Sequence, residues 1–162
     1  MADGHIWNPN EDLINGDSMN LYLTSGKTVL AYATSCSLNV NRETTDTSSK
    51  FSCRWNAVRG GRSSYEVSAD ALYCNAASGI SFDGLLELSN SDDTIDWYIG
   101  QESAYTVDAT HACEDNPHTL DTSKAYYGGK AIVTSVSLTA GNNEAATCSI
   151  SLTGSGAIVK YN

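Results

Sequence analysis

The densest group of side chains that could bind a metal lies within residues 111–118. It holds two imidazoles, one thiol and two carboxylates, from His111, Cys113, Glu114, Asp115 and His118. Protein zinc sites usually combine paired Cys or His residues from two separate places in the chain, and no second pair is visible in this sequence. A polar loop without a metal therefore explains the segment better, and we expect the protein to need no cofactor.

The other residues that could take part in catalysis are three aspartates, Asp92, Asp93 and Asp96, and the histidines His5, His111 and His118. Paired carboxylates can hydrolyse a substrate, but Asp at a turn more often makes local hydrogen bonds. The histidines fall in segments that read as an arm or loops, which gives a catalytic triad little support. Gly154-Ser155-Gly156 reads as a turn beside a terminal strand, not as a nucleophile elbow. We expect no enzymatic activity.

The balance of charges bears on possible partners. Nine basic and 19 acidic residues give a formal net charge of −10. Proteins that hold nucleic-acid phosphates rely on clusters of Lys and Arg, so this balance argues against tight nucleic-acid binding. Two readings stay open: an acidic wall that repels DNA without binding it, and a charge that serves only solubility.

The cellular setting follows from what the sequence lacks. No apolar run reaches the roughly 20 residues that a membrane-spanning helix needs, and the first residues have no signal-peptide pattern. We expect a protein that folds in the cytoplasm without a membrane partner. In that setting we expect its five cysteines to be reduced thiols, several of them buried in the core. They are Cys36, Cys53, Cys74, Cys113 and Cys148.

Alternation of apolar and polar residues predicts a mainly β fold. Four residues are expected to face inward on one strand: Tyr65, Val67, Ala69 and Ala71. Two further sets are each expected to share a face: Ile132, Thr134, Val136 and Leu138, and then Cys148, Ile150 and Leu152. One short helix is predicted after a Ser81 cap, with Phe82, Leu85 and Leu86 on one face, ending near Asn90. About eight strands around this helix indicate a β-sandwich or small barrel.

The chain divides into an N-terminal arm, residues 1–20, and a single β-sandwich domain, residues 21–162. Residues 41–62 are predicted to form a long protruding hairpin, with Gly60-Gly61 at its far edge, and residues 101–123 a surface loop. Long connections of this kind in a compact domain are usually functional or mobile. Trp7 in the arm and Trp55 in the hairpin could anchor a neighbouring subunit or could pack on their own domain.

Five segments in a fixed order carry a resemblance to a known family: Gly60–Leu72, Phe82–Leu88, Trp97–Gly100, Tyr126–Leu138 and Ser149–Gly156. In this order and spacing the chain is similar to the major tail tube proteins of long-tailed, siphovirus-type bacteriophages. Tyr65 stands in the aromatic position of a family strand pattern and Val67 in the aliphatic one, whereas Ala71 replaces the usual Gly. Residues 151–156 match the closing pattern of the family well.

The resemblance implies a non-enzymatic virion protein that assembles into hexameric rings stacked into a tail tube. It implies an acidic lumen through which DNA passes without specific binding, and partners such as the tape measure, terminator and distal tail proteins. It also implies assembly in the host cytoplasm, with the hairpin and the termini bridging rings. The residues expected at contacts between subunits or rings are Trp7, Arg42, Glu43, Asp46, Lys50, Arg54, Trp55, Arg59, Val159 and Tyr161.

Three other functions compete with this one. The inner-tube subunit of a contractile tail or injection machine shares the fold and the ring, and only a sheath partner would separate the two. A secreted carbohydrate-binding β-sandwich would use Trp and Tyr as stacking platforms, but it lacks a signal peptide here. A small β hydrolase has no credible catalytic group in this sequence.

Overall fold

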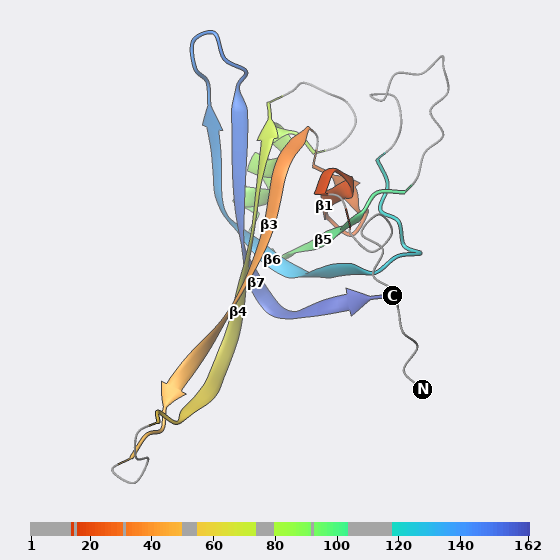
Figure 1. Ribbon diagram of the computed structural model, residues 1–162. Helices are drawn as coiled ribbons and strands as arrows, with labels where there is room; N and C mark the ends of the chain where they lie inside the picture. The colour runs from red at the N-terminus through yellow and green to blue at the C-terminus, as the bar shows by residue number, and fades with distance from the viewer. Residues whose placement is uncertain are drawn as a thin grey trace.

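The computed structural model describes residues 14, 16–30, 32–49, 55–73, 80–91, 93–103 and 118–162. Its strands form one antiparallel sheet in the order β2-β1-β5-β6-β7-β4-β3 (Figure 1). The strands are β1 (Met19–Leu23), β2 (Thr28–Val29), β3 (Ala33–Asp46), β4 (Val58–Leu72), β5 (Ile95–Gln101), β6 (Tyr126–Thr139) and β7 (Thr147–Tyr161). A 3-10 helix, η1 (Gly16–Ser18), precedes β1, and the helix α2 (Phe82–Asn90) lies between β4 and β5. The mainly β fold with one α-helix is confirmed, and the open sheet fits a sandwich.

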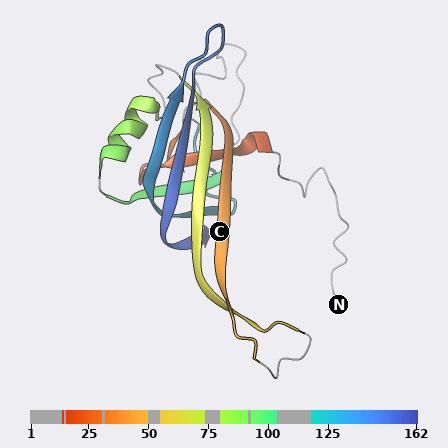
Figure 2. The same cartoon turned by 90° about the vertical axis from the view of Figure 1, so that its left-hand side faces the viewer.

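The sheet folds over on itself into two layers because β6 and β7 each run through both. The front layer consists of β3, β4, residues 147–153 of β7 and residues 132–139 of β6. The back layer consists of β2, β1, β5, residues 126–131 of β6 and residues 154–161 of β7. In Figure 2 the front layer faces the viewer, and β1 and β5 cross behind it.

The main core lies between the two layers. Tyr65, Val67, Ala69 and Ala71 are buried on β4, as are Cys148, Ile150 and Leu152 on β7, so both predicted inward faces are confirmed. The back layer contributes Leu21, Leu23 and Trp97, which are fully buried. Burying side chains of this size stabilises a fold by about 1.5–3 kcal/mol each, which makes this cluster the main source of stability.

The face predicted for β6 is wrong at its first two residues, Ile132 and Thr134, because a β-bulge interrupts the alternation. The pairing of β6 with β7 shifts register between Val133 and Ser135. Val133, Val136 and Leu138 lie opposite the inward residues of β7, whereas Ile132 lies opposite Thr153 on the other face and is 42% exposed. A bulge adds one residue to one strand and exchanges the faces of the residues beyond it.

Tyr65 ties the two layers together. Its hydroxyl donates a hydrogen bond to the Lys130 carbonyl oxygen (2.5 Å) and accepts one from Trp97 Nε1 (3.4 Å). The Tyr65 and Trp97 ring centroids are 5.5 Å apart. The ring covers Gly154, where a Cβ would lie within 2.5 Å of three of its atoms. Gly154 therefore belongs to the interior of β7, and the turn predicted at residues 154–156 is wrong.

The helix α2 begins and ends as predicted, although its apolar face differs. Ser81 has the extended backbone of a capping residue, but its side chain makes no capping hydrogen bond. Leu85 is fully buried, and Phe82 packs against the same core. Leu88 also packs there, whereas Leu86 is 45% exposed, so Leu88 takes the place that was predicted for Leu86. None of the helices in the described ranges has the length and apolarity needed to cross a membrane.

A second, smaller apolar cluster covers the outer side of the back layer. Tyr22 and Tyr126 are buried there, and Tyr161 stacks on Tyr126 with ring centroids 4.8 Å apart and an interplanar angle of 10°. Lys27 Nζ lies 4.8 Å from the centroid of the Tyr126 ring and 5.3 Å from that of Tyr98. This cluster fixes the end of β7 to the body of the subunit.

Several predictions fall partly outside the described residues. Residues 1–13 of the predicted arm and residues 104–117 of the predicted loop are not described, and β1 already includes Met19 and Asn20. Of the cysteines, Cys148 is buried and Cys36 is half-buried, and burial raises the pKa of the Cys36 thiol. The other three cysteines lie outside the described ranges.

Candidate assembly surfaces

The face of the front layer that points away from the core is covered with small, mostly hydroxyl-bearing side chains, and we call it the hydroxyl face. Cross-strand pairing places residues of four strands side by side on this face: Ser35, Ser37 and Asn39 of β3, Ser64, Glu66, Ser68 and Asp70 of β4, Ser149, Ser151 and Thr153 of β7, and Ser135 and Ser137 of β6. The Ser37 and Ser68 hydroxyl oxygens are 2.7 Å apart. Thr134 Oγ1 donates to the Ser151 carbonyl oxygen at 3.1 Å. Side chains this short project little from the backbone, and their hydroxyl groups keep the face hydrated.

Two carboxylates are the only charges on this hydroxyl face, within residues 35–41, 64–70, 135–139 and 149–153. Asp70 accepts hydrogen bonds from Ser149 Oγ (2.6 Å) and Ser35 Oγ (2.9 Å). These bonds, that from Ser149 first, hold the pKa of Asp70 below its usual value. Glu66 lies four residues before Asp70 on the same face and is exposed. The face therefore repels anions and offers no cation to a phosphate.

Two uncovered strand edges border the hydroxyl face. Within the described part of the chain, β3 pairs only with β4 along its length of 14 residues. β6 pairs with β5 only as far as Ala131, so among the described residues no strand pairs with the second edge of residues 132–139, although α2 packs beside β6. Long uncovered edges are rare in monomers because they pair with other chains. The two edges lie on opposite sides of the same layer and are free to join one copy of the chain to the next.

The predicted hairpin is confirmed as two paired strands that project beyond the body of the subunit (Figure 1). Gly60 and Gly61 lie inside β4, beside a register shift, and not at the far edge. Arg42, Glu43, Asp46 and Arg59 are all exposed on these strands, and Trp55, in the connection between them, is 84% exposed. The structure therefore places these five predicted contact residues on one protrusion.

Two of the other predicted contact residues lie within the described ranges. Val159 and Tyr161 lie on β7 in the back layer, where Val159 is exposed and Tyr161 is half-buried in the tyrosine cluster. Trp7, Lys50 and Arg54 lie outside the described residues. The residues that form the hydroxyl face and the two free edges were not predicted from the sequence. Serines spaced by two in three strands, at residues 35 and 37, 135 and 137, and 149 and 151, are the signal that points to them.

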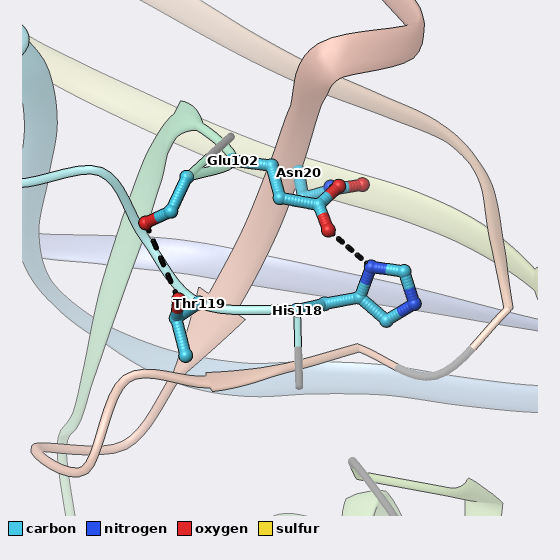
Figure 3. A network of polar contacts seen from close by, with 5 residues as sticks. Asn20, Glu102, His118 and Thr119 are labelled. Atoms are coloured by element: carbon cyan, nitrogen blue, oxygen red, sulfur yellow. Dashed lines mark hydrogen bonds and ion pairs between the residues drawn. The ribbon is translucent and has the colours of Figure 1, made fainter. Parts of the chain in front are cut away.

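The residues considered for metal binding and catalysis give no such site in the described ranges. His118 turns toward Glu102 and its Nδ1 contacts Glu102 Oε1 (Figure 3). Asn20 Nδ2 donates to the second Glu102 oxygen at 3.2 Å. No group of three or more His, Cys, Asp and Glu side chains gathers there for a metal. Asp96 lies 3.7 Å from Lys130 Nζ; Asp92, His5, His111 and Cys113 lie outside the described ranges.

Comparison with solved structures identifies the same fold in assembled tails. A chain from the tail of an empty gene transfer agent particle, refined with C6 symmetry, has a TM-score of 0.70 at 16% identity, covering 93% of this chain and 100% of that chain. A chain of the SPP1 tail tube has a TM-score of 0.62 at 12% identity, covering 93% and 80%. A chain of the extended sheath–tube complex of PVC, an extracellular contractile injection system, has a TM-score of 0.60 at 14% identity, covering 93% and 92%.

Comparison of sequences assigns the family. No match was found among curated protein sequences. The family described as phage tail tube protein matches residues 23–160, which include every strand except the first four residues of β1 and the last residue of β7. The match covers far more than half of the sequence, and the fold agrees with it. The chain belongs to the phage tail tube protein family.

Proposed function

We propose that this chain is the structural subunit of a phage tail tube, in which hexameric rings stack around a channel for DNA. The observation that carries the proposal is the hydroxyl face of the front layer, which has two carboxylates, no Lys or Arg, and a free strand edge on either side. In this assembly the hydroxyl face lines the channel. The back layer and α2 lie outside it.

The chemistry of the face suits a channel that must pass DNA without holding it. Proteins bind nucleic acid mainly by neutralising phosphates with Lys and Arg. Glu66 and Asp70 oppose phosphates instead, and the serine and threonine hydroxyls keep a layer of water on the wall. Asp70 keeps its charge over a wide pH range because Ser149 and Ser35 lower its pKa.

The two free edges provide the means to close a ring. The β3 edge of one subunit pairs with residues 132–139 of β6 in the next, so that six front layers form a continuous wall. Closure of this kind removes the exposed edges that make a lone subunit prone to aggregate. The sixfold number is supported by the C6 symmetry of the gene transfer agent tail, which has the same fold.

The remaining properties follow from this role. The subunit catalyses no reaction and needs no cofactor, and it belongs to the virion tail after assembly in the host cytoplasm. Its partners are copies of itself, the tape measure protein inside the tube, and the terminator and distal tail proteins at its ends. The ten predicted contact residues, Arg42 and Trp55 among them, are proposed to lie between subunits or rings.

A second candidate is the inner tube of a contractile system. The structural likeness to a chain of the PVC sheath–tube complex favours it. A contractile tube has a sheath protein bound to its outer surface, whereas a siphovirus-type tube has none. Isolating native tails and asking whether a sheath protein accompanies the tube separates the two candidates.

Electron microscopy of the purified protein at high concentration tests the proposal. We expect hollow tubes of even diameter built from sixfold rings, because the free edges can be satisfied only between copies. A reconstruction should place Ser37, Ser68 and Ser151 on the channel wall. Protein that stays monomeric at every concentration would refute the proposal, and tubes with this face turned outward would refute the assignment of the channel wall.

A further inference from the structure

Positive charge is concentrated in the hairpin. Residues 42–62 contain five of the nine basic residues and two of the 19 acidic residues, so this segment carries a formal charge of +3 and the remainder of the chain −13. The protein is therefore an acidic body with one basic arm. Copies of the body repel one another, and the hairpin is the part of the chain that an acidic surface on another copy attracts.

One side of the hairpin also has uncovered apolar side chains. Val40 lies opposite the inward residue Tyr65, so alternation places Val40 and Arg42 on the side that continues the core face, and Val58 lies on the same side, opposite Asp46. Val40 is 59% exposed and Val58 is 63% exposed. The Arg42 guanidinium lies over Gly60, where a Cβ would clash with it. Arg59, opposite Thr45, lies on the other side of the hairpin.

The exposed face of α2 has the complementary composition. Asp83 and Glu87 lie one turn apart on the helix, both exposed, and neither forms an ion pair with any cation in the described part of the chain. Leu86, 45% exposed, lies beside them at helical spacing. Two like charges four residues apart destabilise a lone helix slightly. An arginine from another chain would reverse that effect, and Leu86 offers an apolar contact next to it.

The two surfaces lie on opposite sides of the subunit. The hairpin extends from β3 and β4 at one edge of the front layer, and α2 packs beside β6 at the other edge (Figure 2). A hairpin in this position cannot fold back onto its own α2, but it can reach the α2 of another copy. Two different, complementary patches on one chain generate heterologous contacts, which build rings and stacks.

We propose that the core side of the hairpin, at Val40, Arg42 and Val58, docks on the α2 face of another copy, at Asp83, Leu86 and Glu87. The Arg42 guanidinium pairs with the Glu87 carboxylate, and Val58 packs against Leu86. This inference rests on the proposed tube function and assigns the receiving surface for the hairpin. The occupant is a second copy of this chain because the basic arm and the acidic helix are both present in it.

Charge reversal distinguishes docking from general repulsion between acidic subunits. Glu87→Lys makes the net charge less negative, so general repulsion predicts easier assembly, whereas docking predicts harder assembly. Arg42→Glu and Arg59→Glu change the net charge equally, so general repulsion predicts equal effects. Docking predicts a larger effect of Arg42→Glu, because Arg59 lies on the other side of the hairpin. The double variant Arg42→Glu/Glu87→Lys keeps the original net charge of −10.

The experiment measures the critical concentration for tube formation by sedimentation and negative-stain microscopy, for the full chain and these four variants. We expect Arg42→Glu and Glu87→Lys each to raise it about fivefold, since attraction is replaced by repulsion at an exposed pair. The double variant should return to within about twofold of the original protein, and Arg59→Glu should raise the critical concentration less than Arg42→Glu does, because Arg59 lies on the side of the hairpin that does not face α2. Arg42→Gln and Glu87→Gln provide weaker versions should a reversed charge impair folding, which circular dichroism reports.

Two results would overturn the inference. One is a double variant that assembles no better than the worse single variant; the other is a Glu87→Lys protein that assembles more readily than the original. Either result, with the original protein forming tubes, leaves the tube function standing and removes only the docking assignment. An original protein that forms neither rings nor tubes counts against both.

Discussion

Replacing Gly154 by alanine tests whether the ring of Tyr65 is the reason for a glycine at this position of the closing family pattern. A Cβ at residue 154 would lie within 2.5 Å of three Tyr65 ring atoms. Ordinary carbon contacts are about 3.5–4.0 Å, so the ring must move by roughly 1 Å. It is held in place by its hydrogen bond to the Lys130 carbonyl oxygen and by Trp97. Movement therefore strains or breaks these contacts as well.

The expected cost follows from opposing effects. Overpacking a core costs about 1–3 kcal/mol, and weakening the Tyr65 hydrogen bond adds about 1 kcal/mol. A Gly→Ala change also reduces the conformational freedom of the unfolded chain, which raises the unfolding free energy by about 0.4–1 kcal/mol. The net loss of unfolding free energy is about 2 kcal/mol, which corresponds to a fall in Tm of about 4–8 °C for a chain of this length.

Urea denaturation of the monomer, followed by circular dichroism, measures the change. Gly16→Ala is the matched control because a Cβ at residue 16 would meet nothing within 4 Å. We expect the control to stay within about 0.5 kcal/mol of the original protein. A Gly154→Ala protein as stable as the control would refute the reasoning, since it would mean that the ring has room to move.

Two further predictions concern Tyr22 and Trp55. Burial and the charge of Glu102 raise the pKa of Tyr22 to about 12, above the value of about 10 in an unfolded chain. The unfolding free energy should therefore keep its full value below pH 10 and fall as the pH rises toward 12, with a loss of about 1 kcal/mol at pH 11. Tyr22→Phe should remove this pH-dependent loss of unfolding free energy. Identical slopes of unfolding free energy against pH in the two proteins would contradict the assignment of the loss to Tyr22. Trp55→Ala should leave the unfolding free energy within about 0.5 kcal/mol of that of the original protein, because the indole is 84% exposed. Sedimentation should nevertheless show a higher critical concentration for assembly, and unchanged assembly would exclude Trp55 as an anchor.

The sequence predicted the parts of the fold that local alternation determines. Tyr65 to Ala71 and Cys148 to Leu152 alternate without interruption, and both strands bury the expected side chains. The helix at residues 82–90 was also predictable, because its leucines recur at helical spacing. In the two strands the pattern and the final environment agree because the same face of each strand meets the core at all of these residues, whereas in the helix Leu88 packs against the core in place of Leu86.

The errors have one physical origin, which is that contacts between distant strands decide the details. Ile132 was assigned to the wrong face because the bulge near Ser135 depends on how β6 pairs with β7. Gly154 was read as part of a turn because the sequence does not show that Tyr65, far away in the chain, lies over it. The uncovered edges and the α2 face were not predictable for the same reason: a free edge is defined by the strands that do not pair with it.

The passage of β6 and β7 through both layers has a mechanical consequence for an assembled tail. The layers cannot slide past each other without breaking the hydrogen-bonded ladder that β6 and β7 share, so each subunit resists shear as a single stiff block. Bending of the tail must then be taken up at the joints between blocks. In a tube built this way, the bore stays constant while the tail curves, and flexibility is a property of the joints and not of the wall.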